Sequence, residues 1–123
     1  MSVPYEPASG AIVRRRLATD LTAAGLASTV IDDAVLIAAE LVANAVRHGG
    51  VASSGSITVS WEYDASSVTV RVTDGGGIGR PIVRHPKPDQ TSGRGLGIVE
   101  ALAAGWGVDN GPGTTTVWAS LRT

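Results

Sequence analysis

The feature that most constrains the fold is a long run of apolar residues at helical spacing, which extends from about residue 30 to residue 47 or 48. Thr29, followed three residues later by Asp32, resembles a capping box, and the glycines at 49 and 50 stop the pattern. The run predicts an amphipathic helix whose apolar face must be buried against another layer. We expect its buried stripe to consist of Val35, Ala38, Ala39, Val42, Ala45 and Val46.

The C-terminal half of this helix carries a polar face. Glu40 and Asn44 lie four residues apart and therefore on one side of a helix. Arg47 and His48 follow one turn later. A carboxylate there could accept a proton, and a carboxamide oxygen is a hard ligand that suits Mg²⁺. On these residues alone two interpretations stay open: part of a metal–nucleotide site, or the solvated face of an ordinary amphipathic helix.

The residues that follow alternate between apolar and polar side chains, first over 56–63 and then over 68–73. Residues 64–67 form a turn between the two predicted strands. Each strand has one apolar face, so the pattern predicts an antiparallel sheet with helices covering one side.

Three further elements complete the predicted fold. A helix over residues 9–24 begins at Ser9 as its N-cap, ends at Gly25 and turns Val13, Leu17 and Leu21 inward. A short helix begins at residues 93–97, and two strands over 106–108 and 114–121 close the chain. The expected fold is a two-layer α/β sandwich, with the helices on one face of a mixed, mainly antiparallel sheet.

Length and charge restrict the classes of protein that fit. A chain of 123 residues is long enough for one buried core and short for two, so we expect residues 1–123 to form a single domain. Ten Lys and Arg against 11 Asp and Glu give a net charge of −1, which implies no general attraction to nucleic acid. The absence of cysteine excludes disulfides, zinc–thiolate sites and thiol catalysis.

Nothing in the sequence indicates export or membrane insertion. Residues 1–10 lack a basic segment followed by an apolar core, and no run of about eighteen apolar residues occurs. Together with the lack of cysteine, this favours a cytoplasmic location and no contact with a membrane.

Two glycine-rich stretches, residues 75–79 and 93–97, flank a loop that contains three prolines. The first follows Asp74 at the end of a predicted strand. Backbone N–H groups of such glycines, and the N-terminus of a helix, favour an anion such as phosphate. The chain lacks the Gly–Lys–Ser/Thr of a Walker loop, and no helix follows residues 75–79 directly, as a dinucleotide fingerprint requires.

The order of these motifs resembles a known family. A helix with Glu40 and Asn44, a strand that ends in Asp74, a Gly–x–Gly–Leu–Gly segment and a final Gly–Thr–Thr strand follow one another as in the GHKL superfamily of ATP-binding domains. Within that superfamily the chain is similar to the stand-alone bacterial anti-sigma-factor serine/threonine kinases. The resemblance covers nearly the whole chain from Ser9 onward. It implies the Bergerat fold, with ATP and Mg²⁺ as cofactors.

The resemblance also implies roles for individual residues. Asn44 would bind the Mg²⁺ that bridges the phosphates, and Glu40 would be the catalytic base. Asp74 would accept a hydrogen bond from the adenine amino group, helped through water by Thr115 or its neighbour Thr114. Ile78 stands where the usual Asp–x–Gly–x–Gly box has its second glycine. The other implied nucleotide-binding residues are Arg47 and His48, Gly76 and Ile78, and Gly93, Arg94, Gly95, Leu96 and Gly97.

Two functions follow from the resemblance. The first is a kinase that phosphorylates a serine of a small anti-sigma-factor antagonist, sequesters a sigma factor, or does both. The alternative is a non-catalytic module of the same fold whose ATP occupancy shapes a surface for a protein partner. A detached histidine-kinase catalytic domain is less favoured, because no dimerisation helix with a phospho-accepting histidine is found. Relatives often form homodimers, so the resemblance leaves a homodimer open, although no residue of this chain indicates one. No direct contact with nucleic acid is expected.

Overall fold

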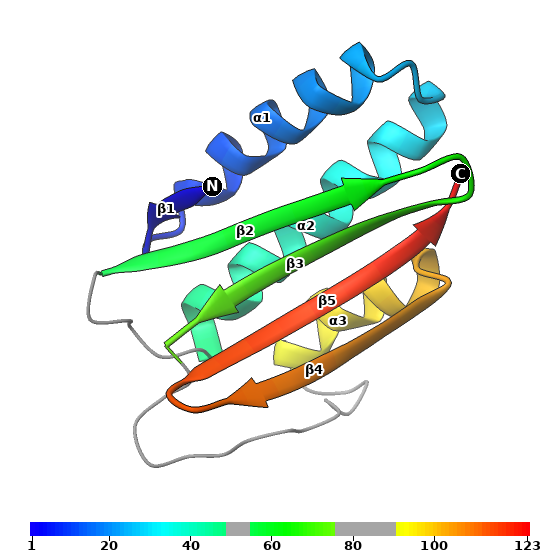
Figure 1. The fold of residues 1–123 in the computed structure, drawn as a ribbon. Coiled ribbons are helices and arrows are strands. Elements are labelled where there is room, and N and C mark those ends of the chain that lie inside the picture. The colour runs from blue at the N-terminus through cyan, green and yellow to red at the C-terminus, as the bar shows by residue number, and fades with distance from the viewer. Residues whose placement is uncertain (49–54, 76–90) are drawn as a thin grey trace.

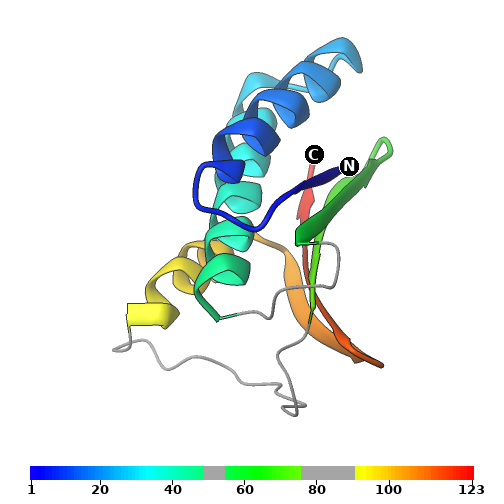
Figure 2. The same ribbon diagram turned by 90° about the vertical axis from the view of Figure 1, so that its left-hand side faces the viewer.

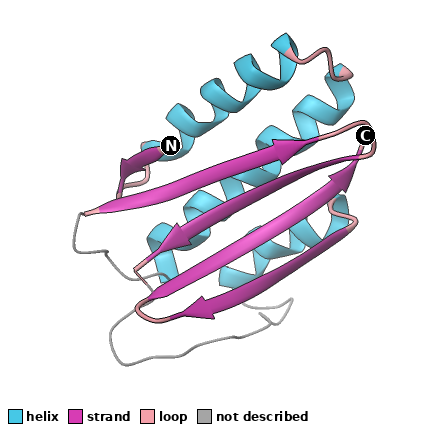
Figure 3. Ribbon diagram, in the orientation of Figure 1, coloured by secondary structure: helices cyan, strands magenta, loops and turns pink. Residues whose placement is uncertain are grey.

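The computed structural model describes the backbone of residues 1–48, 55–75 and 91–123, and the side chains of these residues apart from 48 and 91–96. Within them, five strands form one sheet in the order β1-β2-β3-β5-β4, and every neighbouring pair is antiparallel. The helices form a second layer on one face of this sheet (Figures 1–3). The predicted two-layer α/β sandwich is therefore confirmed. The elements are β1 (Ser2–Pro4), α1 (Ser9–Ala23), α2 (Ser28–His48), β2 (Ser56–Tyr63), β3 (Ser67–Asp74), α3 (Thr91–Leu102), β4 (Gly105–Gly111) and β5 (Thr114–Arg122).

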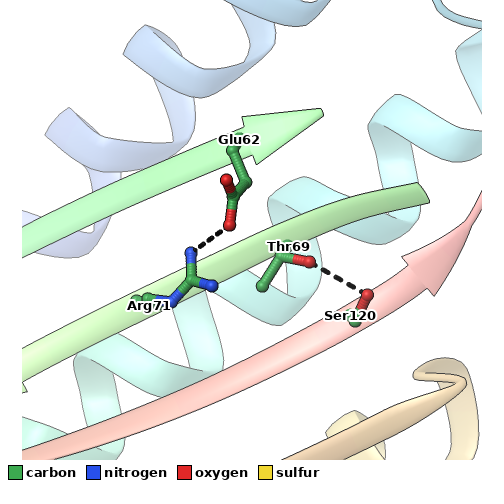
Figure 4. Close-up of polar contacts among 4 residues, drawn as sticks. All are labelled: Glu62, Thr69, Arg71 and Ser120. Atoms are coloured by element: carbon green, nitrogen blue, oxygen red, sulfur yellow. Dashed lines mark hydrogen bonds and ion pairs between the residues drawn. The ribbon is translucent and has the colours of Figure 1, made fainter. Parts of the chain in front are cut away.

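The two faces of the sheet differ in polarity, as the alternating sequence predicts. In β3, Val68, Val70 and Val72 point into the core and are buried. The residues between them lie on the opposite face, which is polar. There Thr69 Oγ1 donates to Ser120 Oγ at 3.0 Å, and an Arg71–Glu62 ion pair joins β3 to β2 at 2.7 Å (Figure 4). Helices thus cover only the apolar face of the sheet.

The helix α2 is the centre of the helical layer, where it contacts α1, α3 and the strands β3 and β5 (Figure 1). Its buried stripe is displaced from the predicted one. Of the six predicted residues, Ala38, Val42 and Ala45 are buried, whereas Val35, Ala39 and Val46 are only partly buried. Apolar residues occupy most of the helix circumference, so their spacing did not fix the centre of the stripe. The additional buried residues of α2 are Ala34, Ile37 and Leu41.

The helices α1 and α2 begin at other residues than predicted, whereas α1 ends before Gly25 as predicted. Ser9 is the first residue of α1 and not its cap, and its buried hydroxyl donates to the Pro4 carbonyl at 2.5 Å. Thr29 lies inside the first turn of α2, which begins one residue earlier. Gly25 follows α1 with a φ of 82°, a left-handed conformation that glycine adopts without strain.

The strand β1 was not predicted as part of the sheet. It pairs with the start of β2, where Val3 lies opposite Ile57, and Val3 is buried. Three residues are too short to show an alternating pattern, and Pro4 argues against a strand except at an edge, where β1 lies. This strand fixes the position of the residues that follow it.

Among the described helices, none combines the length and the apolar character needed to cross a bilayer.

Candidate functional site

Four chain segments lie at the same end of the sandwich. The last turn of α2, the end of β3, the start of β5 and the start of α3 all lie toward the lower end of the molecule in Figure 2. Figure 1 shows the same four segments on the same side. Several of the predicted site residues come from these segments, and Asn44 and Glu40 lie in the turns of α2 that precede its last. The fold thus brings groups that are far apart in the sequence to the same end of the sandwich.

The helix α2 contributes Glu40 and Asn44 to this end. Both side chains are partly buried, and they stand one turn apart on the same side of the helix. Arg47, in the last turn, is exposed. His48 is the last helical residue, and its side chain lies outside the described residues. The carboxylate of Glu40 and the carboxamide of Asn44 are therefore both partly accessible to solvent, so a ligand could reach them.

The strand β3 contributes Asp74, which breaks the pattern of its own strand. The inward positions of β3 are occupied by valines until the last, where Asp74 is only 5% exposed. Moving a carboxylate out of water costs free energy unless it is paired or hydrogen-bonded. A valine would have continued the core at no such cost, so packing alone does not account for an aspartate here. The carboxylate can accept a hydrogen bond from an N–H donor such as a purine amino group.

The register of the sheet distinguishes the two candidate threonines of β5. Thr115 pairs with Asp74 across the antiparallel ladder, so both side chains face the helical layer. Thr114 occupies the preceding position and is exposed. The Thr115 hydroxyl donates to Asn110 Oδ1 at 3.1 Å, which leaves its oxygen able to accept a hydrogen bond. Of the two, Thr115 is the residue placed beside Asp74.

The structure adds Tyr5, a residue that the sequence patterns did not single out. Its hydroxyl lies 3.0 Å from the Ala45 carbonyl and 3.1 Å from the Val46 carbonyl, both in the last turn of α2. Burial raises the pKa of the Tyr5 phenol, and the negative charge of Asp74 raises it further. Tyr5 thus connects the last turn of α2 to the start of β2, the strand that pairs with the end of β3. No periodic signal marks it, because it follows a strand too short to be recognised.

The second glycine-rich stretch lies within a helix, where the prediction placed it at a helix start. Because α3 begins at Thr91, Gly93 and Gly95 lie in its first turns and Gly97 in its middle. The side chains of Arg94 and Leu96 lie outside the described residues. A Cβ atom built on Gly97 would have nothing within 4 Å among the described residues, and the residue is exposed. Among the described residues, therefore, no packing contact at this position requires a glycine.

The remaining predicted residues, Gly76 and Ile78, lie outside the described residues. No group of three or more His, Cys, Asp or Glu side chains in the described part of the chain could hold a metal ion. Mg²⁺ differs from zinc in this respect, because it is usually held by one or two protein oxygens together with waters and substrate phosphates. The carboxamide oxygen of Asn44 is a ligand of that kind.

A helix-covered antiparallel sheet with a buried carboxylate, a carboxamide and a glycine-bearing helix at one end has the features of an ATP-binding domain. A comparison with protein families agrees: the family described as the histidine kinase-like ATPase domain matches residues 3–121. The chain therefore belongs to this family, and the expected GHKL-type domain is confirmed. Membership implies that the protein binds ATP. A search of curated proteins found no match.

Proposed function

We propose that the protein is an ATP- and Mg²⁺-dependent serine/threonine kinase of the anti-sigma-factor type, which transfers the γ-phosphate of ATP to a small protein antagonist. Sequestration of a sigma factor would be a second activity of the same protein. Membership of the histidine kinase-like ATPase family supports the ATP-binding part of this proposal. The identity of the acceptor rests on the resemblance of the sequence motifs to anti-sigma-factor kinases.

One observation carries the assignment of the nucleotide site. Asp74, buried at the end of β3, lies opposite Thr115 on the face toward α2, while Asn44 lies in the part of α2 that reaches the same end. This arrangement supports an adenine amino group on Asp74 and phosphates toward Asn44 and α3. Gly97 would let a phosphate approach the α3 backbone, since no atom of the described residues lies within 4 Å of where its Cβ would be.

The chemistry proposed for the chain centres on Glu40. The serine oxygen of the partner bonds to the γ-phosphorus, and the bond from that phosphorus to the ADP oxygen breaks. Glu40 takes the proton that the serine loses, and its partial exposure leaves it accessible to a partner. Mg²⁺, when bound, would neutralise charge on the phosphates, with Asn44 as its protein ligand.

The test compares Glu40→Gln with Glu62→Gln. The second variant makes the same chemical change on the opposite face of the sheet, where Glu62 is 67% exposed in an ion pair. Binding of Mg-ATP is measured by calorimetry, and transfer of labelled phosphate is measured against candidate serine-containing partners. A positioned base contributes about 10²- to 10⁴-fold in rate. Glu40→Gln should therefore keep ATP binding and lose transfer by about that factor, whereas Glu62→Gln should behave as wild type.

Two other outcomes have defined meanings. Transfer that survives Glu40→Gln would show that Glu40 is not the base. Wild-type protein that binds Mg-ATP and transfers phosphate to none of the partners would support the non-catalytic module, in which ATP shapes a protein-binding surface. Binding to a sigma factor with and without ATP would then be the activity to measure.

A further inference from the structure

The N-terminal segment reaches the candidate site through a single side chain, that of Tyr5. Its oxygen lies within hydrogen-bond distance of the carbonyls of Ala45 and Val46, so one O–H group is shared between two acceptors. These carbonyls belong to the last turn of α2, which ends at His48. The last four carbonyls of a helix have no partner within the helix. Tyr5 therefore supplies a hydrogen-bond donor to the helix end that bears Asn44.

The backbone around Tyr5 is fixed to the sheet and to the start of α1 by hydrogen bonds. Before Tyr5, Pro4 pairs with Ser56 in the β1–β2 ladder, and the Pro4 carbonyl accepts the buried Ser9 hydroxyl. Its own N–H donates to the Gly55 carbonyl at 3.1 Å. The ring packs against the core. Because the segment is fixed to the sheet, the phenol connects the sheet to the end of α2 in a defined position.

The sheet side of the candidate site is represented by Asp74, at the end of β3. Tyr5 is hydrogen-bonded through its N–H to Gly55, directly before β2. The start of β2 pairs with the end of β3, where Thr58 lies opposite Thr73. The negative charge of Asp74 also contributes to the raised pKa of Tyr5. Asn44 and Asp74 come from different layers, and a nucleotide that contacts both needs the two layers in a fixed relation. A residue that holds binding groups in place before the ligand arrives improves affinity, because less conformational entropy is then lost on binding.

We propose that Tyr5 is a positioning residue of the nucleotide site, which fixes the last turn of α2 relative to the end of β3 and so preorganises Asn44 and Asp74. This inference rests on the nucleotide site proposed above. Tyr5 need not touch ATP; it acts through the α2 carbonyls. The class of ligand whose affinity it controls is an adenine nucleotide with Mg²⁺.

The test is Tyr5→Phe, which keeps the packed ring and removes the O–H group. Its matched control is Trp61→Phe, which removes the 2.7 Å hydrogen bond from Trp61 Nε1 to Asp20 Oδ2, another connection between the sheet and a helix. Mg-ATP affinity is measured by calorimetry at a temperature where circular dichroism shows all proteins folded. The loss of one neutral hydrogen bond predicts a Kd for Tyr5→Phe about three- to tenfold higher than wild type. Trp61→Phe should stay within about twofold.

Two further readouts distinguish positioning from a general loss of stability. The ratio of the ATP Kd in EDTA to that with Mg²⁺ should fall in Tyr5→Phe, because Asn44 is then less well placed. Amide hydrogen exchange in residues 45–48 should be faster in Tyr5→Phe and unchanged in Trp61→Phe.

The possible failures are separable. If wild-type protein does not bind Mg-ATP, the nucleotide site itself is refuted. If wild type binds and folded Tyr5→Phe has the same Kd and the same exchange rates, the role of Tyr5 is refuted. An equal loss of affinity in Trp61→Phe would also refute it, because destabilisation alone would then explain the effect.

Discussion

Gly97 offers a prediction in which stability and binding change in opposite directions. It lies inside α3, is exposed, and has none of the positive φ values that would exclude a side chain. Gly107 differs, because a Cβ there would lie 2.9 Å from Trp118 Nε1. A methyl group on Gly97 therefore meets no described protein atom, whereas the proposed site brings a phosphate to that position.

The expected magnitudes follow from this environment. A glycine in an exposed helix interior is about 0.5–1 kcal/mol less favourable than alanine. Gly97→Ala should therefore raise the free energy of unfolding by about that amount, or Tm by about 2–4 °C for a domain of this size. A methyl group forced into a close contact costs about 1–3 kcal/mol, so the Kd for Mg-ATP should rise by about fivefold or more.

The assay combines urea unfolding without nucleotide and calorimetric titration with Mg-ATP. Ala101→Gly is the matched control, because Ala101 is an exposed residue of the same helix. It should lower stability by a similar amount and leave the Kd unchanged. A Gly97→Ala protein that is more stable and binds Mg-ATP as wild type does would refute the role of Gly97. A less stable Gly97→Ala protein would refute the assumed helical environment.

Two further predictions concern β5 and the β2–β3 turn. Thr115→Val should weaken Mg-ATP binding by about three- to tenfold, because it removes a hydroxyl beside Asp74. Thr114→Val should leave the Kd unchanged. Equal Kd values for the two variants in calorimetry would show that the β3–β5 register does not select Thr115. The backbone N–H groups of Ser66 and Ser67 donate to Asp64 Oδ1 and hold the pKa of Asp64 below its usual 3.8. The ionised Asp64 side chain therefore stabilises the fold at pH values above 3.8. This stabilisation is lost as pH falls through the lower pKa of the folded state. The difference in unfolding free energy between wild type and Asp64→Asn should therefore shrink as pH falls below about 4, and a constant difference would refute this.

The parts of the fold that the sequence predicted depend on short-range patterns. The strands β2 and β3 were recognised by alternation, and the turn between them is closed by Asp64, whose N–H donates to the Ser67 carbonyl. The inward side of α1 was correct because Val13, Leu17 and Leu21 are its buried apolar residues. In each case, neighbours within a few residues determine the local structure.

The parts that the sequence did not predict depend on long-range pairing. The choice between Thr115 and Thr114 needs the β3–β5 register, which joins residues about forty positions apart. Tyr5 reaches Ala45 across a similar separation, and no local pattern encodes that contact. The buried stripe of α2 depends on which neighbours cover it. The residues that connect the candidate site to the rest of the fold could therefore not be predicted from the sequence.

The central claim is that the end of the sandwich with Asp74 binds ATP. Its most direct measurement is calorimetric titration of Mg-ATP into wild type, Asp74→Asn and Asp109→Asn, the last being the same change at an exposed position of β4. Hydrogen bonds to a charged group contribute about 1.5–3 kcal/mol. We expect wild type and Asp109→Asn to bind Mg-ATP, and Asp74→Asn to have a Kd at least about tenfold higher. Wild-type protein without binding at millimolar ATP, or Asp74→Asn with wild-type affinity, would contradict it.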